Sequence, residues 1–481
     1  MPITPITPTG PSAPNTLTPD SAGTIAAPNT LTPDSAGTIA APNTLSADAA
    51  GTIAAPNTLS ADAAGTVAVP NTLTADAVGT IAVPATLASV TPAALPRTLT
   101  PLVDLNFSDG IYSQSGTPKS FADVLTFTRA SSATFINRIV KATGGYNYFV
   151  DNALTNVLRV EYDYQTGENL GALIEGPSTN LALYSEQLDN AAWTAQDGAA
   201  VTGNAIVSPD LTTTADKIDF STNIDGIVAQ SVAATASPTG TFTFSIWLKA
   251  DSPQVIIIRI GNNINSQSTI NVTTDWKKFE VTGTGTGSQS VSSPQLRNSS
   301  ASAKTVYAWG AQYEETPIST SYIKTESATV SRSKDDLQNQ TLSIPKANES
   351  KTIHLELNMV KPANSNGKLF MTSETQHFAE VLTNEYVNYY AGGSIINGSL
   401  GGGVTISNIK KLDFVTDTIG GTVKNYENGT VKNSVAFTAG TGTLTKFVIG
   451  ASASNNQHLN GHISRFTTYD KALTAQEISL L

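Results

Sequence analysis

Histidine is the side chain that most often does acid–base or metal chemistry at neutral pH, and this chain has only 4. They are His354, His377, His458 and His462. The last two have the spacing of a metal pair only on a helix, whereas the sequence around them is typical of turn and strand. Cysteine is absent, and we find neither a Gly-x-Ser-x-Gly elbow nor a phosphate-binding glycine loop. We therefore expect no catalytic residue, no metal and no cofactor.

Paired carboxylates are the other route to catalysis, because glycosidic bond hydrolysis uses two of them about 5–10 Å apart. The chain has 38 Asp and Glu residues, so a capsule polysaccharide depolymerase stays open as an alternative. Phage depolymerases are usually long β-helices with coils of about 20–30 residues. No such period is evident after residue 100. This favours binding over hydrolysis.

Tryptophan is the residue type that points most directly to a ligand, because its flat apolar ring can stack on a sugar. The four tryptophans lie close together in sequence: Trp193, Trp247, Trp276 and Trp309. Trp276 and Trp309 are expected in the core. Residues 241–249 alternate strictly, which puts Trp247 and Lys249 opposite the apolar face of their strand. We predict Trp247 and Lys249 as glycan contacts. Packing of Trp247 against a second module or a sister chain is the alternative.

The composition indicates that strands position these side chains. Only 14% of residues are charged, 40% are hydrophobic, and there are 36 glycines, which suits β-strands joined by short turns. The net charge is −11, so a nucleic acid partner is not expected. No apolar stretch is long enough to span a membrane. The first residues lack the basic and apolar regions of a signal peptide. An adhesive composition without such a signal is normal for a virion part, which is assembled in the host cytoplasm.

Residues 1–96 are repetitive. Prolines recur every 14 residues, at Pro14, Pro28, Pro42, Pro56, Pro70 and Pro84, and such a fixed period indicates a repeat architecture. Each unit has two larger apolar anchors, such as Leu17 and Ile25, around a turn containing glycine. Two anchors cannot offset the cost of ordering 14 residues. One chain alone should therefore have no core here.

Three arrangements of this shaft are open. The repeats are a flexible tether, lie extended along the virion, or wind with sister chains around a shared core. Their strand–turn–strand–proline pattern resembles the triple β-spiral shafts of viral fibres, which implies a homotrimer. We expect a homotrimer that joins other virion proteins of the capsid, collar or tail through its N-terminal region.

Residues 97–180 are expected to form a joining β region. Four segments in and just after it have distinctive sequences: TRASSAT at 128–134, RVEYD at 159–163, LIEG at 173–176 and TNLALYS at 179–185. As a set, they resemble a module of tailed-bacteriophage head-fibre and tail-appendage proteins, over about residues 104–330. That resemblance implies virion attachment and surface binding. We interpret Arg129 as half of a structural ion pair at a strand end.

Two antiparallel β-sandwiches of jelly-roll type are expected to follow, over 181–334 and 335–481. The first is similar to carbohydrate-binding modules attached to phage proteins. The second ends with GHISRFTTYDKALT at 461–474, which resembles the last strand of concanavalin-like and laminin-G-like domains. Thr474 and Glu477 fit a capping box, and Asn428–Gly429 fits a hairpin turn. We find no loop dense in Asp and Asn, so we do not predict a calcium site.

The resulting prediction is a mainly β virion surface fibre of a tailed bacteriophage. It binds host surface polysaccharide without catalysis, and it sits exposed on the virion. A purely structural capsid or collar decoration protein and the depolymerase are the alternatives.

Overall fold

The computed structural model divides the chain into two units, Met1–Leu99 and Thr100–Leu481. Before residue 99 it describes only ten short strands. From there to the C-terminus it describes the chain except for twelve short gaps: 142–144, 222–224, 234–238, 288–290, 340–348, 359–366, 373–376, 382–386, 392–393, 399–410, 439–446 and 453–456.

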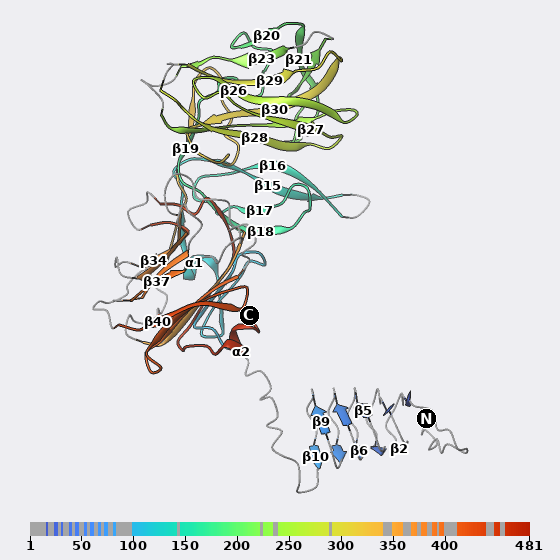
Figure 1. The fold of residues 1–481 in the computed structure, drawn as a ribbon, viewed down its shortest axis with the longest axis vertical. Helices are drawn as coiled ribbons and strands as arrows, with labels where there is room; N and C mark the ends of the chain where they lie inside the picture. Colours follow the sequence, from blue (N-terminus) through green and yellow to red (C-terminus); the bar gives the residue numbers. More distant parts are fainter. Residues whose placement is uncertain are drawn as a thin grey trace. The chain divides into compact units, whose positions relative to one another are not determined.

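In the first unit, each repeat pairs with the next repeat of the same chain. Thr16 and Leu17 pair in parallel with Thr30 and Leu31, and the same step recurs along two ladders (Figure 1). Each repeat is thus one coil with two strands, the arrangement of a solenoid. The first ladder holds β1 (Thr16–Leu17), β3 (Thr30–Leu31), β5 (Thr44–Ala47), β7 (Thr58–Ala61) and β9 (Thr72–Ala75). The second holds β2 (Thr24–Ala26), β4 (Thr38–Ala40), β6 (Thr52–Ala54), β8 (Thr66–Ala68) and β10 (Thr80–Ala82).

This pairing differs from the three arrangements considered from the sequence, because the strands find their partners inside one chain. The anchors of successive repeats come into register without a sister chain, as in Leu31 beside Leu45. The argument that the repeats need sister chains is therefore weakened. The homotrimer and the virion attachment stay predictions.

We predict that deleting one whole repeat preserves the ladders, whereas deleting half a repeat does not. Removing residues 44–57 joins two coils in the same phase, since the strands advance by one repeat per coil. Removing residues 44–50 shifts every later strand out of register. Hydrogen exchange on the full-length protein should show the remaining strand amides equally protected in the first variant and exchanging faster in the second. Equal protection in both variants would contradict the observed register.

The second unit is built on an outer sandwich, whose first sheet mixes strands from both ends of the unit. Strand β42 is central and pairs with both β11 and β33. In order, the sheet holds β13 (Thr117–Lys119), β12 (Ile111–Gln114), β11 (Val103–Asn106), β42 (Gly461–Tyr469), β33 (Lys351–Asn358), β38 (Lys411–Asp417), β39 (Thr422–Glu427) and β40 (Thr430–Ala436), with β18 (Asn169–Ile174) also on β42 and β17 (Val160–Tyr162) on β18.

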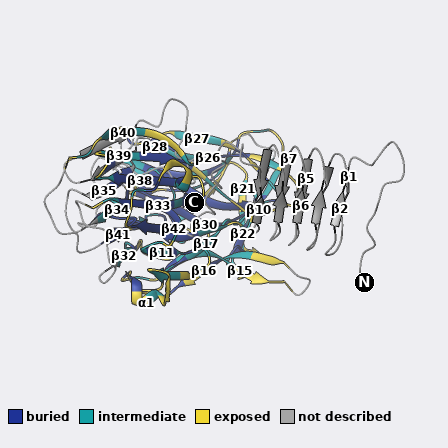
Figure 2. Cartoon of the chain, turned by 90° about the horizontal axis from the view of Figure 1, so that it is seen from below, coloured by how far each residue is buried: buried dark blue, intermediate teal, exposed yellow. Residues whose placement is uncertain are grey.

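The second sheet of the outer sandwich faces the first across a shared apolar core. Its order is β14 (Thr126–Thr128), β32 (Asp336–Asn339), β41 (Phe447–Ile449), β34 (Gly367–Thr372), β35 (His377–Val381), β36 (Val387–Ala391) and β37 (Ser394–Gly398). Phe370 is fully buried and lies against the rings of Phe414, Phe447 and Phe466. In Figure 2, β33, β38 and β42 of this sandwich are coloured mainly as buried. Most strands of the expected joining region therefore belong to the outer sandwich: β11–β13, β17 and β18 are part of its first sheet, and β14 is part of its second.

The middle sandwich is inserted between β18 and β32 of the outer one. Its first sheet has the order β20 (Trp193–Gln196), β23 (Gly226–Gln230), β29 (Val291–Asn298), β26 (Gln254–Asn262) and β27 (Ser266–Val272), with β24 (Val232–Ala233) also on β29. Its second has the order β21 (Ala199–Ile206), β22 (Ala215–Phe220), β30 (Lys304–Glu314), β25 (Thr241–Lys249) and β28 (Lys277–Thr284). As predicted, Phe242, Phe244, Ile246 and Leu248 share the core between the sheets. The mainly antiparallel β-sandwich fold is confirmed.

Two small ribbons lie where the sandwiches meet. Strands β19 (Ser178–Asn180) and β31 (Val330–Arg332) are the paired entry and exit of the inserted sandwich. Strands β15 (Ala133–Val140) and β16 (Tyr146–Ala153) form a two-stranded hairpin. The hairpin lies between the sandwiches in Figure 1. It provides one wall of the cleft described below.

The described helices are single turns, α1 (Phe121–Val124) and α2 (Ala475–Ile478). The predicted capping box is confirmed, since Thr474 and Glu477 cap α2 reciprocally. Asn428 and Gly429 have positive φ between β39 and β40, as a type I′ hairpin turn requires. Among the described residues, no helix has the length and apolar character needed to cross a membrane.

Candidate binding cleft

A buried ion network ties the two sandwiches together where the chain passes between them. Arg159 lies 2.5 Å from Asp335 and 2.9 Å from Glu175. Arg129 pairs with the other oxygen of Asp335 at 3.2 Å, and Arg332 lies 3.5 Å from Glu175. All five residues are at most 4% exposed. Arg129 is therefore part of a structural ion pair, as the sequence analysis interpreted it.

The network keeps Glu175 charged although it is buried. Burial alone would raise the pKa of Glu175, but Arg332, Arg159 and two hydrogen bonds from Ser321 hold that pKa well below its ordinary value. Ser321 belongs to the middle sandwich, whereas Glu175 follows β18 of the outer one. The network thus fixes the inserted sandwich against its host, and with it the wall of the neighbouring cleft.

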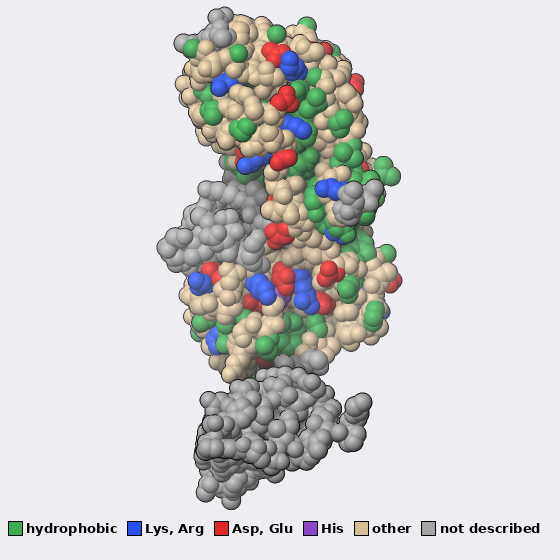
Figure 3. All heavy atoms as spheres, turned by 90° about the vertical axis from the view of Figure 1, so that its right-hand side faces the viewer, with side chains coloured by type: hydrophobic (Ala, Val, Ile, Leu, Met, Phe, Trp, Pro, Cys, Tyr) green, Lys and Arg blue, Asp and Glu red, His purple; other side chains and the backbone are tan. Residues whose placement is uncertain are grey.

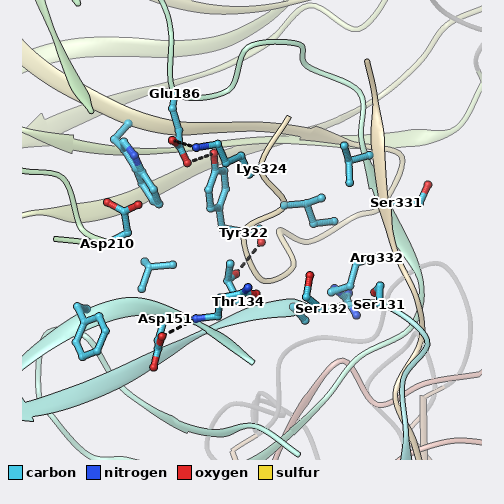
Figure 4. A pocket seen from close by; sticks show the side chains of 17 residues that line it. Ser131, Ser132, Thr134, Asp151, Glu186, Asp210, Tyr322, Lys324, Ser331 and Arg332 are labelled. Carbon is cyan, nitrogen blue, oxygen red and sulfur yellow. Dashed lines mark hydrogen bonds and ion pairs between the residues drawn. The ribbon is translucent and has the colours of Figure 1, made fainter. Parts of the chain in front are cut away.

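The cleft has a volume of about 460 Å³ and lies between the β15–β16 hairpin and the middle sandwich. That is the size of a small-molecule or sugar site. Its aromatic lining residues are the half-buried Phe149 on the hairpin and the buried Trp309 and Tyr322 of the middle sandwich. The polar lining residues labelled in Figure 4 are Ser131, Ser132, Thr134, Asp151, Glu186, Asp210, Tyr322, Lys324, Ser331 and Arg332.

Hydrogen bonds between the two walls hold the cleft open at a fixed width. The Val150 N–H donates to the carbonyl of Pro209 at 2.9 Å, and Thr134 Oγ1 donates to the carbonyl of Tyr322 at 2.6 Å. On the sandwich wall, Glu186 accepts from the hydroxyl of Tyr322 at 3.0 Å and from Lys324 at 2.6 Å (Figure 4). Because these groups are already fixed, the cleft is formed before any ligand arrives.

The predicted glycan contact at Trp247 is not supported by the structure. Its ring is only 4% exposed and belongs to a cluster with Trp276, Trp309 and Tyr322. Tyr164, from the turn after β17, covers it with the ring centroids 4.8 Å apart. A ring without a free face cannot stack on a sugar, so Trp247 is a packing residue, which was the alternative. Lys249 is half-buried at the end of β25 and is not among the residues lining the cleft.

The other predicted aromatic positions agree with the structure. Trp276 and Trp309 are buried, at 8% and 1% exposure, as expected for core rings. Trp193 is buried as well, and its Nε1 donates to the carbonyl of Leu183 at 3.0 Å. A contact surface that depends on exposed tryptophan is therefore absent from the described part of the chain.

The two histidines that could have formed a metal pair, His458 and His462, have different surroundings. His462 Nε2 lies 2.7 Å from Glu161. His458 is buried beside Gly176, and its Nε2 has no hydrogen-bond partner among the described residues. No group of three metal-ligating side chains occurs in the described residues.

Sequence reasoning missed the residues that line the cleft. Phe149, Asp151, Asp210 and Lys324 carry no motif, and they come from segments that only the tertiary fold brings together. Two signals were available: the TRASSAT segment supplies Ser131, Ser132 and Thr134 of the lining, and Glu186 directly follows the TNLALYS segment.

A sequence comparison with known families bears on the outer sandwich. Residues 359–479 match the family described as the Concanavalin A-like lectin/glucanases superfamily. This part of the chain is similar to the concanavalin A-like domains of lectins and glucanases. The match confirms the expected concanavalin-like domain, although the observed sandwich also takes in strands before residue 180. No curated protein matches the chain.

Several solved structures are similar to parts of the chain. Domain 4 of AbnA, an extracellular arabinanase from Geobacillus stearothermophilus in complex with arabinotriose, is 16% identical over 34% of this chain and 80% of its own, with a TM-score of 0.26. A CBM4 structure is 20% identical over 29% of this chain and 95% of its own, with a TM-score of 0.21. The enzymatically active domain of tailspike protein 4 of Bacteriophage CBA120 is 13% identical over 62% of this chain and 43% of its own, with a TM-score of 0.23.

Proposed function

We propose that this protein is a virion surface fibre of a tailed bacteriophage that binds host surface polysaccharide without catalysis. The observation that carries the binding half is the cleft of about 460 Å³, which combines an aromatic wall with fixed hydroxyl-accepting carboxylates. Sugars are bound by this combination, because their rings have apolar faces and their edges carry hydroxyls. The lectin-like match of residues 359–479 supports the same class of ligand.

The fibre half of the proposal rests on different features. The 14-residue repeats make an elongated, repetitive N-terminal unit, and the segments quoted above resemble phage head-fibre and tail-appendage proteins. The N-terminal unit would attach to capsid, collar or tail proteins, and residues 100–481 would face the host. A structural decoration protein would share the repeats but would need no cleft.

The binding experiment uses the purified full-length protein and an array of bacterial capsular and O-antigen polysaccharides. We predict that Phe149→Ala weakens binding about tenfold, because losing one aromatic contact in a binding site costs about 1–2 kcal/mol. Tyr146→Ala is the matched control: Tyr146 lies on the same strand, is 40% exposed and is outside the cleft. Figure 3 shows the surface on which this end of the hairpin projects.

Three results would count against this function. Binding of the wild type to no polysaccharide would favour the decoration protein. Release of oligosaccharides during incubation would favour the depolymerase. Equal loss of binding in both hairpin variants would place the contact at the hairpin end rather than in the cleft.

A homotrimer belongs to the same proposal, because three weak sites on one fibre give a strong attachment. Each chain has a mass of 50.1 kDa, so light scattering on the intact protein should give about three times that value. A monomeric mass would contradict the homotrimer. Strong attachment would then require many fibres on each virion.

A further inference from the structure

We infer that a second cavity, next to the cleft, is a further sugar subsite, in which a ligand hydroxyl donates to Nδ1 of His462 and a ligand oxygen accepts from Lys278. This inference rests on the proposed function and adds a subsite to it. The cavity has a volume of about 250 Å³. That is slightly below the range of sites for drug-sized ligands, so the cavity suits a single sugar unit.

The second cavity adjoins the cleft. Thr134, Val150 and Tyr322 are lining residues of both. The other walls of the cavity come from β17, β18 and the start of β42 in the outer sandwich, and from the loop after β30 in the middle sandwich. Figure 1 shows β17 and β18 next to the hairpin. The two spaces therefore lie along the same seam between the sandwiches.

Glu161 fixes the ring of His462 and determines which of its nitrogens carries the proton. One oxygen of Glu161 accepts from the Ile136 N–H of the hairpin at 2.8 Å, and the other lies 2.7 Å from His462 Nε2. A carboxylate accepts hydrogen bonds and does not donate them, so Nε2 is the donor. The neutral ring then has no hydrogen on Nδ1, which is left as an acceptor.

The Nδ1 atom of His462 points to a ligand because it lacks a partner although its side chain is buried. His462 is only 8% exposed, and it lines the cavity. Among the described residues, only the Nε2 of its ring has a hydrogen-bond partner. Nδ1 is not sealed inside the protein, in contrast to the unpartnered Nε2 of His458. A ligand in the cavity therefore reaches Nδ1, and a sugar hydroxyl is a suitable donor to it.

Lys278 provides a donor to the same cavity. It is half-buried on β28, and its Nζ donates to the carbonyl of Thr320 at 2.7 Å. An ammonium group has three hydrogens, so two remain for a ligand. No carboxylate among the described residues forms an ion pair with Lys278. The cavity thus presents one acceptor and one donor, which a hydroxylated ring satisfies together.

The other charged residues that line the cavity leave no large excess of either sign. Glu161 is paired with His462, and Glu175 belongs to the buried ion network. Asp163 accepts from the N–H groups of Gln165 and Thr166 in its own turn, at 2.9 and 2.6 Å. Its charge offsets that of Lys278. A neutral sugar unit suits this balance.

Ring surface is available beside these polar groups. Tyr162 and Tyr164 are half-buried lining residues of the cavity, and Leu173 and Ile318 add aliphatic surface. A few fixed polar groups in a mainly apolar lining are what orients a small ligand in a site of this kind.

The first test is a nitrogen NMR spectrum of isotope-labelled histidine in the full-length protein, which has only four histidines. His462→Gln identifies the signals of His462. At mildly alkaline pH we expect the proton on Nε2, as the bond to Glu161 requires. Adding an oligosaccharide of the polysaccharide that binds best in the array should shift the Nδ1 signal of His462. The signals of His354, which is buried beside Asp413, should not move.

The second test measures binding of the same polysaccharide to two variants. His462→Phe removes the acceptor and Lys278→Met removes the donor, and each should weaken binding about tenfold. Lys277→Met is the matched control, because Lys277 is the preceding residue of the same strand, is exposed and lies outside the cavity lining. His462→Phe also leaves Glu161 without a donor, so its unfolding midpoint is compared with that of the wild type. Lys278→Met keeps the pair of Glu161 and His462 intact.

The outcomes separate this subsite from the proposed function. Wild-type binding in both variants, with no shift of the His462 signals, means that the cavity holds only water and overturns the subsite. A proton on Nδ1 overturns it as well. So does weaker binding in His462→Phe alone with an unmoved Nδ1 signal, since His462 then acts only through the hairpin. Each of these results leaves glycan binding in the cleft intact. Binding of the wild type to no polysaccharide overturns the proposed function itself.

Discussion

Replacing Arg159 with methionine is expected to lower the free energy of unfolding of residues 100–481 by about 3–5 kcal/mol. The guanidinium of Arg159 is fully buried and bonds to both carboxylates of the network, Glu175 and Asp335. Methionine fills a similar volume, but it removes one of the positive charges that stabilise the buried carboxylates of Glu175 and Asp335. Removing one member of a buried pair is costly because the charge left behind remains desolvated.

Urea unfolding followed by tryptophan emission measures this effect, since all four tryptophans lie in the middle sandwich that the network fixes. Arg297→Met is the matched control. Arg297 pairs with Asp225 at 2.8 Å, but the carboxylate is 53% exposed, so its loss should cost less than about 1 kcal/mol. Similar losses in the two variants would show that the network contributes no more than a surface pair.

The fold class and most elements of the sandwiches could be predicted because they depend on local pattern. Residues 241–249 alternate, and the structure places their four apolar side chains in one core as expected. Local pattern also fixed the capping box at Thr474 and the turn at Asn428. The apolar run at 255–260 is covered mainly on one face, since Val255 is 52% exposed.

Topology and the candidate site could not be predicted in the same way. The pairing of β11 with β42 joins residues that are hundreds of positions apart, and no local signal marks such a partner. For this reason residues 97–180 looked like a separate region, although β11–β14, β17 and β18 pair into the sheets of the outer sandwich. Trp247 was misjudged for a related reason. Its face of the strand is opposite the core, but Tyr164 from another segment covers that face.

The acid sensitivity of the second unit should depend on His458. Burial lowers the pKa of His458 to about 4, whereas an unfolded histidine has a pKa of about 6.5. The unfolded chain therefore binds a proton first as the pH falls. Stability conferred by neutral His458 is present above about pH 6.5 and is lost progressively down to about pH 4. Over this range the loss amounts to about 3 kcal/mol.

His354 provides the control, because its shift has the opposite direction. Burial by itself lowers the pKa of His354, but hydrogen bonds to Asp413 and Glu356 raise it above the ordinary value. The stability that protonated His354 contributes is fully present below about pH 6.5, and it is lost as the pH rises through the pKa of His354 in the folded protein. His458→Gln should thus flatten the decline in unfolding free energy between pH 7 and pH 4, and His354→Gln should steepen it.

Urea unfolding of the full-length variants at several pH values between 7 and 4 tests both histidines at once. Each substitution also changes packing, and this shifts the whole curve by a constant amount without changing its slope. The slope therefore reports the difference between the numbers of protons bound by the unfolded and the folded states, and it does not depend on the loss of packing. If His458→Gln keeps the wild-type slope, then His458 takes up its proton over the same pH range in the folded and the unfolded protein. In that case an acceptor or water must reach its buried Nε2, and the site beside Gly176 is more open than the observed packing.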